Sequence, residues 1–301
     1  MLGAELVSTG IGEGRVLTGL IGRGILQSRT PWLHEQEGDA QGLRLVYALF
    51  DFNDRGWSDT NLPALLDATQ LIGFAGLNVT FPFKQAVIEL LDELSGSARE
   101  VGAVNTIAFR DGRRIGYNTD VSGFAEGFLA QMADGQRDHV LQLGCGGAGA
   151  ATAHALLSKI GARQVTLADT DAARMQRLHA HLAEVYGSGR VRMTADPADA
   201  MRSVDGLVNA TPIGMDKFPG LPITASAIEQ RHWVADIVYF PLETALLAEA
   251  RRKGCRTLDG SGMAVGQAAD AFSIFTGLSP NRQRMRDSFA AFASGKGQVA
   301  A

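Results

Sequence analysis

The fold is decided by residues 139–160, which read HVLQLGCGGAGAATAHALLSKI. The stretch opens with a short apolar strand pattern, His139 to Leu143, and continues through a glycine-rich loop, 144–149, into a helical pattern over 150–160. Glycines at 144, 146 and 149 give the spacing GxGxxG between a predicted strand and a predicted helix, which is the context that the dinucleotide-binding fingerprint requires. The stretch therefore predicts the first βα unit of a doubly wound α/β domain.

A glycine loop of this kind lets backbone N–H groups at a helix N-terminus approach a pyrophosphate, whose charge meets the positive end of the helix dipole. The alternative is a turn that only joins strand to helix. The next predicted strand, 164–169, ends in Asp169, whose carboxylate can accept hydrogen bonds from both adenosine ribose hydroxyls of a dinucleotide. We therefore predict cofactor contacts at Gly144, Gly146, Gly147, Ala148, Gly149 and Asp169.

Asp169 also predicts which dinucleotide is used. A 2'-phosphate beside it would place like charges about 4 Å apart, which costs about 4 kcal/mol per unit charge at an effective dielectric constant of about 20. NAD is therefore favoured over NADP. Asp171 adds negative charge that supports this preference, whereas Arg163 and Arg174 are close enough in sequence to oppose it.

Length and composition exclude several classes of protein. The chain has 301 residues, of which 46% are hydrophobic and 20% charged, so we expect about two compact domains. Its 28 Lys and Arg residues against 32 Asp and Glu give a net charge of -4, which provides no broad positive field for nucleic acid or an anionic membrane. The sequence has no signal-peptide pattern and no long apolar run, and Cys145 and Cys255 lack a CxxC partner. We expect a cytoplasmic protein.

The rest of the chain alternates strand and helix patterns, as βαβ units do. We predict an α/β substrate domain over 1–122, completed by 264–301, and a Rossmann-type doubly wound dinucleotide-binding domain over 123–263. A long C-terminal helix over 264–275 is expected to return to the first domain, before a frayed tail over 294–301. The other predicted strands are 16–21, 43–50, 204–209, 233–238 and 256–258, and the other predicted helices are 30–41, 174–186, 243–253 and one that begins near Gln85. A short strand that runs into polar residues at its carboxyl end is predicted at 76–80, and the same pattern returns at 103–106 and 116–120.

Small polar side chains collect in the first predicted domain. They are Ser28, Thr30, Asn78, Thr80, Asn105, Asn118 and Thr119, together with one amine, Lys84, and one carboxylate, Asp120. A set of hydroxyls and amides of this kind suits a small polyol. By composition alone Lys84 would be a surface lysine and Asp120 a helix N-cap, and the two amides of Asn78 and Asn105 would satisfy nearby backbone.

No metal site is predicted. His179 and His181 lie two residues apart on a predicted helix, a spacing that points them to different faces. The other histidines, His34, His139, His154 and His232, have no ligand-like neighbours in sequence.

Several short motifs extend over nearly the whole chain. They are SRTP at 28–31, NVTFPFK at 78–84, GAVNT at 102–106, GYNTD at 116–120, the loop at 144–149, NATPIGM at 209–215, DIVY at 236–239, and GSGM at 260–263 followed by Gln267. Taken together, these motifs resemble the shikimate dehydrogenase family.

The resemblance implies a role for particular residues. It implies that Lys84 and Asp120 are the catalytic pair, and that Asn209 and Thr211 belong to the cofactor site. It implies substrate contacts at Ser28, Thr30, Asn78, Thr80, Asn105, Tyr239 and Gln267. On this basis we expect an active cleft between the two domains, in which Lys84 and Asp120 face the nicotinamide.

Two departures from the usual NADP-dependent members of the family favour one branch of it. The segment Ala168-Asp169-Thr170 stands where those members usually carry an arginine for the 2'-phosphate. The segment Ser28-Arg29-Thr30 replaces their Ser-x-Ser, as in NAD-linked quinate/shikimate dehydrogenases. The resemblance therefore implies NAD-dependent, reversible oxidation of the C3 hydroxyl of quinate and/or shikimate to the 3-dehydro ketone. The hydroxyl proton would pass through Lys84, so we expect oxidation to be faster at alkaline pH.

Other interpretations stay open at this point. The chain could be an NADP-linked shikimate dehydrogenase, an aminoshikimate dehydrogenase, or a ligand-binding sensor that has lost turnover, although the presence of both Lys84 and Asp120 argues against a sensor. The sequence does not choose between quinate and shikimate, between a monomer and a homodimer, or between aromatic amino acid biosynthesis and quinate catabolism.

Overall fold

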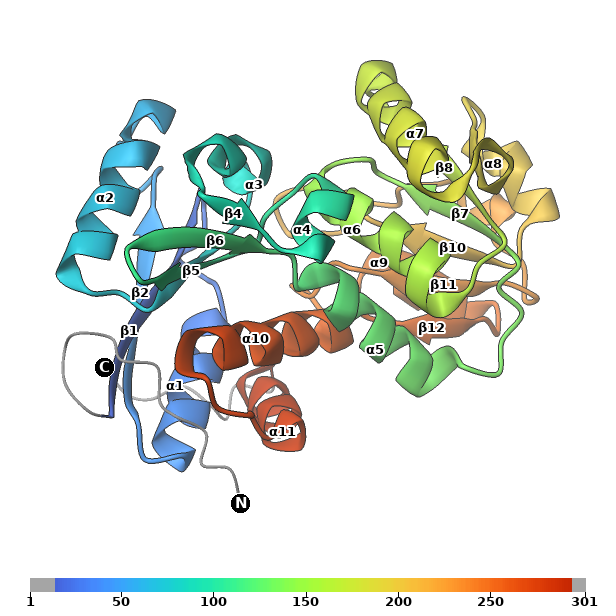
Figure 1. Ribbon diagram of the computed structural model, residues 1–301. Helices are drawn as coiled ribbons and strands as arrows, with labels where there is room; N and C mark the ends of the chain where they lie inside the picture. Colours follow the sequence, from blue (N-terminus) through green and yellow to red (C-terminus); the bar gives the residue numbers. More distant parts are fainter. Residues whose placement is uncertain (1–13, 294–301) are drawn as a thin grey trace. The chain divides into compact units, whose positions relative to one another are not determined.

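The computed structural model describes residues 14–293 and divides the chain into two units (Figure 1). Unit 1 comprises Met1–Thr119 and Val265–Ala301, and unit 2 comprises Asp120–Ala264. The sequence predicts the domain boundaries after residue 122 and before residue 264. The boundaries in the structure lie within a few residues of these positions, after residues 119 and 264. The tail predicted over 294–301 lies outside the described residues.

Unit 2 contains a six-stranded sheet in which every strand pairs in parallel. Its order is β12-β11-β10-β7-β8-β9, so the two halves run outward from the neighbouring strands β7 and β10. This is the strand order of a doubly wound dinucleotide-binding fold, and it confirms the predicted fold class. The strands are β7 (His139–Leu143), β8 (Gln164–Ala168), β9 (Val191–Met193), β10 (Gly206–Asn209), β11 (Trp233–Asp236) and β12 (Arg256–Leu258).

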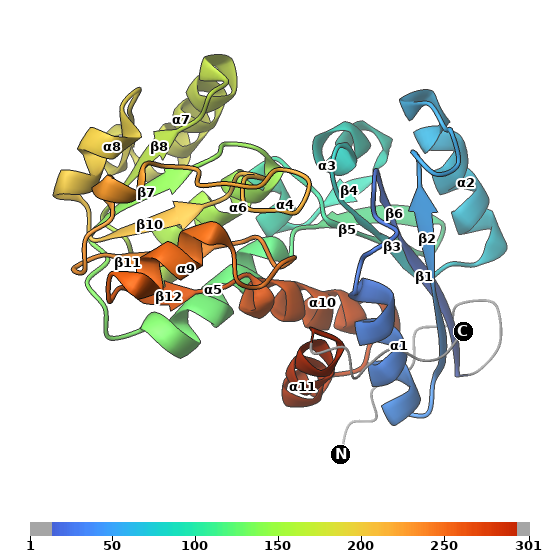
Figure 2. The ribbon, with the colours of Figure 1, turned by 180° about the vertical axis from the view of Figure 1, so that it is seen from behind.

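The central strands of unit 2 are buried because helices cover both faces of the sheet. All four residues of β10 and of β11 are buried. Figures 1 and 2 show α6 on one face and α9 on the other. The helices of this unit are α5 (Asp120–Met132), α6 (Gly147–Ala155), α7 (Ala172–Tyr186), the short α8 (Pro197–Ala200) and α9 (Ala245–Arg252). Buried parallel strands of this kind read as continuous apolar runs in the sequence, which is why they were predictable.

The helix that follows the glycine loop begins earlier than predicted. The sequence predicts it over 150–160, whereas α6 begins at Gly147 and is followed by a π-helical turn over Leu156–Ile160. Glycine has a low helix propensity, so the sequence around Gly147 and Gly149 gives no signal for the first turn of the helix. The loop and the first helical turn therefore overlap.

Unit 1 has a mixed six-stranded sheet of order β2-β1-β3-β5-β6-β4. Strand β1 pairs in parallel with β2 and β3, whereas β5 is antiparallel to both of its neighbours, β3 and β6. The strands are β1 (Arg15–Gly22), β2 (Arg44–Asp51), β3 (Gly76–Val79), β4 (Glu93–Leu94), β5 (Thr106–Arg110) and β6 (Arg113–Tyr117). The result is an α/β domain, as predicted, with an antiparallel part that the βαβ pattern did not indicate.

Both faces of the unit 1 sheet carry a hydrophobic core. Neighbouring residues of a strand point to opposite faces, and Leu20 and Ile21 of β1 belong to two different core clusters. Phe272 and Phe275 of the C-terminal helix α10 (Ser261–Thr276) are fully buried in the cluster that contains Leu20. The C-terminal helix therefore packs on the first domain, as the sequence predicts.

The remaining helices of unit 1 are α1 (Thr30–Ala40), α2 (Leu62–Ile72), α3 (Phe83–Ala86), α4 (Gly96–Val101) and α11 (Arg282–Ala293). The helix predicted to begin near Gln85 begins at Phe83 and has only four residues, because α3 gives way to a 3-10 turn over Val87–Leu90. Within residues 14–293, no helix is long and apolar enough to cross a membrane.

Candidate functional site

The glycine-rich loop between β7 and α6 contains glycines of two kinds. Gly144 has a positive φ of 95°, and a Cβ there would lie 2.6 Å from the carbonyl oxygen of Ala210. A Cβ on Gly149 would lie 2.2 Å from the carbonyl oxygen of Gly144. A Cβ on Gly146, by contrast, would meet no heavy atom within 4 Å. Gly144 and Gly149 are thus needed for the loop to fold, whereas Gly146 borders open space that a ligand can enter.

A buried amide holds this loop in place. Gln142, the fourth residue of β7, donates hydrogen bonds from Nε2 to the carbonyl oxygens of Gly144 at 3.0 Å and Gly149 at 2.8 Å. Thr152 Oγ1 in turn donates to Gln142 Oε1 at 2.8 Å. Gln142 and Thr152 are not among the residues predicted from the sequence. A polar residue inside an apolar strand, two positions before the glycines, is the signal that could have identified Gln142.

Asp169 follows β8 directly, and its carboxylate is fixed beside the loop. Its Oδ2 accepts a hydrogen bond from the backbone N–H of Cys145 at 2.7 Å, and its Oδ1 accepts one from the N–H of Asp171 at 2.8 Å. The Asp169 side chain is only 7% exposed. Arg174 lies 3.8 Å from Oδ2 of Asp169 and 3.4 Å from Oδ2 of Asp171. The carboxylate therefore cannot rotate away without giving up both backbone bonds, and its oxygens retain lone pairs for further donors.

Asn209, at the end of β10, organises the loop that contains Thr211. Its Nδ2 donates to the carbonyl oxygen of Ile213 and to Asp236 Oδ1, both at 2.9 Å. Its Oδ1 accepts from the backbone N–H of Thr211 at 3.1 Å and from Thr211 Oγ1 at 2.7 Å. All four hydrogen-bonding positions of the amide are used within the protein, so the Asn209 side chain shapes this loop.

Asp236 is the acidic partner of Asn209 and is itself buried. Its Oδ1 also accepts from the N–H of Val238 at 3.0 Å, and its Oδ2 accepts from Thr244 Oγ1 at 2.7 Å. Burial raises the pKa of Asp236 to about 6, and the hydrogen bonds from Thr244, Val238 and Asn209 offset only part of this effect. Asp236 lies in the DIVY motif at 236–239, for which the sequence predicts no role of this carboxylate.

In unit 1, the two predicted asparagines lie in one hydrogen-bond network. Asn78 Nδ2 donates to Thr106 Oγ1 at 3.0 Å, and Thr106 Oγ1 donates to Asn105 Oδ1 at 3.1 Å. Asn105 Oδ1 also accepts from the N–H of Thr119 at 2.8 Å, and Asn105 Nδ2 donates to Thr119 Oγ1 at 2.9 Å. Both amides are 3% exposed. Strands β3 and β5 bring them together, since Asn78 pairs with Thr106 across the sheet.

Three further predicted residues of unit 1, Thr80, Lys84 and Gln267, lie near this network along the chain or through a backbone hydrogen bond. The carbonyl oxygen of Gln267 accepts from Thr119 Oγ1 at 3.1 Å. The carbonyl oxygen of Lys84 accepts from the N–H of Val104 at 2.8 Å, which places the backbone of Lys84 beside the residue that precedes Asn105. Thr80 follows β3. Thr80, Lys84 and Gln267 are all half-buried.

Ser28 and Thr30 form a separate pair at the start of α1. Ser28 Oγ donates to Thr30 Oγ1 at 3.0 Å and accepts from the N–H of Thr30 at 3.3 Å. Of the residues predicted to act on or bind the substrate, two belong to unit 2. Asp120 is the first residue of α5 and is 5% exposed, whereas Tyr239 follows β11 and is 38% exposed.

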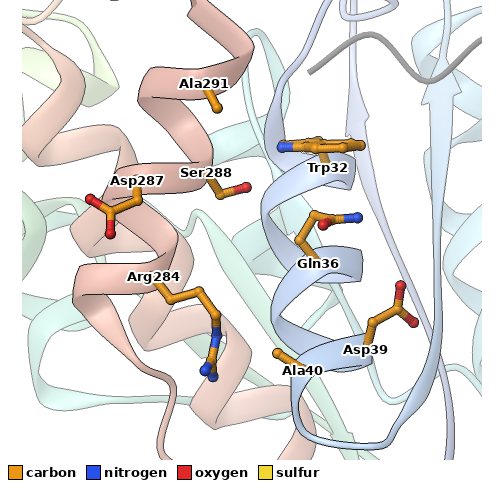
Figure 3. A pocket seen from close by; sticks show the side chains of 8 residues that line it. All are labelled: Trp32, Gln36, Asp39, Ala40, Arg284, Asp287, Ser288 and Ala291. Atoms are coloured by element: carbon orange, nitrogen blue, oxygen red, sulfur yellow. The ribbon is translucent and has the colours of Figure 1, made fainter. Parts of the chain in front are cut away.

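No group of three or more His, Cys, Asp or Glu side chains within residues 14–293 is arranged to hold a metal ion. A groove of about 610 Å³ lies between α1 and α11 of unit 1, and Figure 3 shows side chains of both helices along it. Its lining residues, Trp32, Gln36, Asp39, Ala40, Arg284, Asp287, Ser288 and Ala291, include none of the predicted site residues.

Comparison with known proteins gives consistent matches. Residues 20–107 match the family model described as shikimate dehydrogenase substrate binding domain, and residues 260–288 match the model described as shikimate 5'-dehydrogenase C-terminal domain. A shikimate dehydrogenase (NADP(+)) from Arthrobacter sp. (strain FB24) is 50% identical over 275 residues, which are 91% of this chain and 94% of the relative.

Relatives named for the other dinucleotide are nearly as similar. A quinate/shikimate dehydrogenase (NAD(+)) from Corynebacterium efficiens is 47% identical over 278 residues, which are 91% of this chain and 97% of the relative. The solved structure of a quinate dehydrogenase from Corynebacterium glutamicum in complex with NAD matches with a TM-score of 0.87 and 45% identity, covering 92% of this chain and 99% of that one.

Proposed function

This chain belongs to the shikimate dehydrogenase family, and from that premise we propose that it reversibly oxidises the C3 hydroxyl of quinate and/or shikimate to the 3-dehydro ketone, with NAD as hydride acceptor. The observation that carries this proposal is the carboxylate of Asp169, fixed at the end of β8 by two backbone N–H groups beside the glycine-rich loop. Relatives of similar identity are named for NAD and for NADP, so their names alone do not choose the cofactor.

The residues of the loop fit a dinucleotide. The open space at Gly146 leaves room for a pyrophosphate at the N-terminus of α6, where the helix dipole favours negative charge. Asp169 would accept hydrogen bonds from the ribose hydroxyls, and a 2'-phosphate would meet the charges of both Asp169 and Asp171. Asn209 and Thr211 would hold the backbone of the neighbouring loop in shape for the cofactor. The bound dinucleotide supplies the hydride acceptor.

Arg174 favours a second candidate, an NADP-linked shikimate dehydrogenase. Its guanidinium lies beside Asp169 and could pair with a 2'-phosphate. In this protein, however, Arg174 contacts the carboxylates of both Asp169 and Asp171, so the local charge that remains is negative. NAD therefore stays the better-supported cofactor.

For the chemistry, we assign the proton transfer to Lys84 and a positioning and charge role to Asp120. Lys84 takes the proton of the C3 hydroxyl during oxidation and returns it during ketone reduction. Ser28 and Thr30 would bind the carboxylate of the substrate through their hydroxyls. Ring hydroxyls would be held by Asn78 and Asn105 of the polar network and by Thr80 and Gln267 of the same unit, and we also assign a substrate contact to Tyr239 of unit 2.

Replacement of Lys84 by alanine tests this assignment. General acid–base groups contribute about 100-fold or more to kcat, so Lys84→Ala should lower kcat by at least that factor. Lys159→Ala, which removes an exposed lysine from the π-helical turn of unit 2, is the matched control and should keep wild-type kcat. A Lys84→Ala variant that retained more than about a tenth of the wild-type kcat would overturn the role given to Lys84.

We also propose that the protein acts in the cytoplasm as a monomer or homodimer. Both cysteines, Cys145 and Cys255, are free and buried in the described structure, which suits a reducing compartment. Light scattering of the purified protein would give the oligomeric state.

A further inference from the structure

We propose that Tyr47 is a positioning residue of the substrate site: it fixes the side chain of Asn78 so that the amide oxygen of Asn78 accepts a hydrogen bond from a hydroxyl of the polyol. Asn105, in contrast, donates an amide hydrogen to a hydroxyl oxygen of the polyol. This inference rests on the proposed function. Tyr47 lies in β2, two strands away from Asn78 in β3, and its hydroxyl donates to Asn78 Oδ1 at 2.7 Å. Tyr47 is 5% exposed and Asn78 is 3% exposed, so the bond is shielded from water.

The hydrogen bonds of Asn78 determine what it can offer a ligand. Its Nδ2 donates to the carbonyl oxygen of Asn105 at 3.3 Å and to Thr106 Oγ1 at 3.0 Å, which uses both amide hydrogens. Its Oδ1 accepts from Tyr47 and keeps a second lone pair. Asn78 is therefore an acceptor towards the substrate, and a ring hydroxyl must donate to it.

Asn105, in the same chain of hydrogen bonds, is a donor towards the substrate. Its Oδ1 accepts from Thr106 Oγ1 at 3.1 Å and from the N–H of Thr119 at 2.8 Å. Its Nδ2 donates to Thr119 Oγ1 at 2.9 Å, which leaves the second amide hydrogen for a ligand oxygen. Thr119 Oγ1 passes the chain on to the carbonyl oxygen of Gln267.

Tyr47 sets the direction of this chain at its first bond. The phenol hydroxyl is the group that contacts Asn78 Oδ1, and its ring is held in the core, 4.9 Å from the ring of His34 between centroids. Without the hydroxyl, Asn78 Oδ1 loses its fixed donor, and a buried amide with an unsatisfied oxygen becomes free to move or to take up water. The substrate would then meet an acceptor that is no longer in place.

The test compares two tyrosine-to-phenylalanine variants of the full chain. Tyr47→Phe should raise the KM for quinate or shikimate about tenfold, which is the typical effect of one buried hydrogen bond, and should leave the KM for NAD within about twofold. Tyr186→Phe removes a hydroxyl that bonds His154 Nδ1 at 2.9 Å in unit 2, and it should leave both KM values unchanged. Equal KM values for the polyol in wild type and Tyr47→Phe, with wild-type turnover present, would overturn the proposal for Tyr47 alone.

A double-mutant cycle separates positioning from a general structural role. If Tyr47 acts through Asn78, then Tyr47→Phe should change the KM by less than about twofold in an Asn78→Ala background. Additive effects would contradict the proposal. Thr106→Val breaks the same chain between Asn78 and Asn105, and should raise the polyol KM in the same way, so it provides the test if Tyr47→Phe does not fold. If the wild-type protein oxidises neither polyol, the proposed function on which this inference rests is wrong.

Discussion

His34 is completely buried in unit 1 among aromatic rings. Its ring lies 4.9 Å from that of Tyr47 and 5.8 Å from that of Phe275, between centroids, and neither ring nitrogen has a hydrogen-bond partner among the described residues. Burial lowers its pKa to about 3. The folded protein therefore holds a neutral imidazole, whereas the unfolded chain takes up a proton below a pH of about 6.5.

We predict that His34 makes the folded state sensitive to acid. A depressed histidine pKa contributes stability above the unfolded value, and this stability is lost as the pH falls from about 6.5 towards 3. Relative to His34→Leu, the wild type should lose about 1.4 kcal/mol of unfolding free energy per pH unit in this window. Denaturant titrations of both proteins from pH 7.5 down to 4 measure the difference. Parallel curves would show that His34 is not the group responsible.

Asp236 should act with the opposite sign. Its pKa is raised to about 6 by burial, so its contribution to stability is fully present below the unfolded value of about 3.8 and is lost as the pH rises through 6. Asp236→Asn keeps an acceptor for Asn209 and removes the titration. The unfolding free energy of the wild type should therefore fall by about 2.4 kcal/mol relative to the variant between pH 4 and 7. A constant difference over this range would contradict the assignment.

At the scale of elements, the strand–loop–helix unit of β7 and α6 allows fold and binding to be separated. Gly149→Ala places a Cβ against the carbonyl oxygen of Gly144, so it should lower the melting temperature. Gly146→Ala meets no atom of the protein, so it should keep the wild-type melting temperature but lose most of the stabilisation given by NAD. Thermal melts with and without NAD measure both effects. A Gly146→Ala protein stabilised by NAD as strongly as the wild type would argue against a pyrophosphate at this loop.

Strands and helices were predictable from the sequence where the pattern is local. Strands β7 and β12 have the predicted bounds, because a local signal marks the end of each: β7 ends at the glycine-rich loop and β12 ends before Asp259-Gly260. The hairpin of β5 and β6 was missed, although its turn, Asp111-Gly112, is a typical hairpin signal in which both residues have positive φ. The sequence predicts that Asn105 and Asn118 each lie at the carboxyl end of a strand. Asn118 does follow β6, whereas Asn105 precedes β5.

At the scale of the whole molecule, long-range polar contacts were the part that the sequence could not provide. The residue types around Asn78, Asn105 and Asp169 were identified from motifs, but their partners were not. Tyr47 is 31 residues from Asn78, and Cys145 is 24 residues from Asp169. Such pairs depend on which strands become neighbours, and hydrophobic periodicity carries no information on that choice. The roles of Gln142, Asp236 and Tyr47 therefore emerged only with the fold.

The two units divide the proposed work between them. Unit 2 carries the glycine-rich loop and Asp169, whereas unit 1 carries Lys84 and the network of Asn78 and Asn105. A dehydrogenase needs both, so the whole chain is the object to test.

The most direct measurement is the initial rate of reduced-dinucleotide formation by the purified wild-type protein, with quinate and shikimate each assayed against NAD and NADP. We predict turnover of at least one of the two polyols, with a higher kcat/KM for NAD than for NADP. Oxidation that proceeds only with NADP, or no oxidation of either polyol with either dinucleotide, would contradict the account.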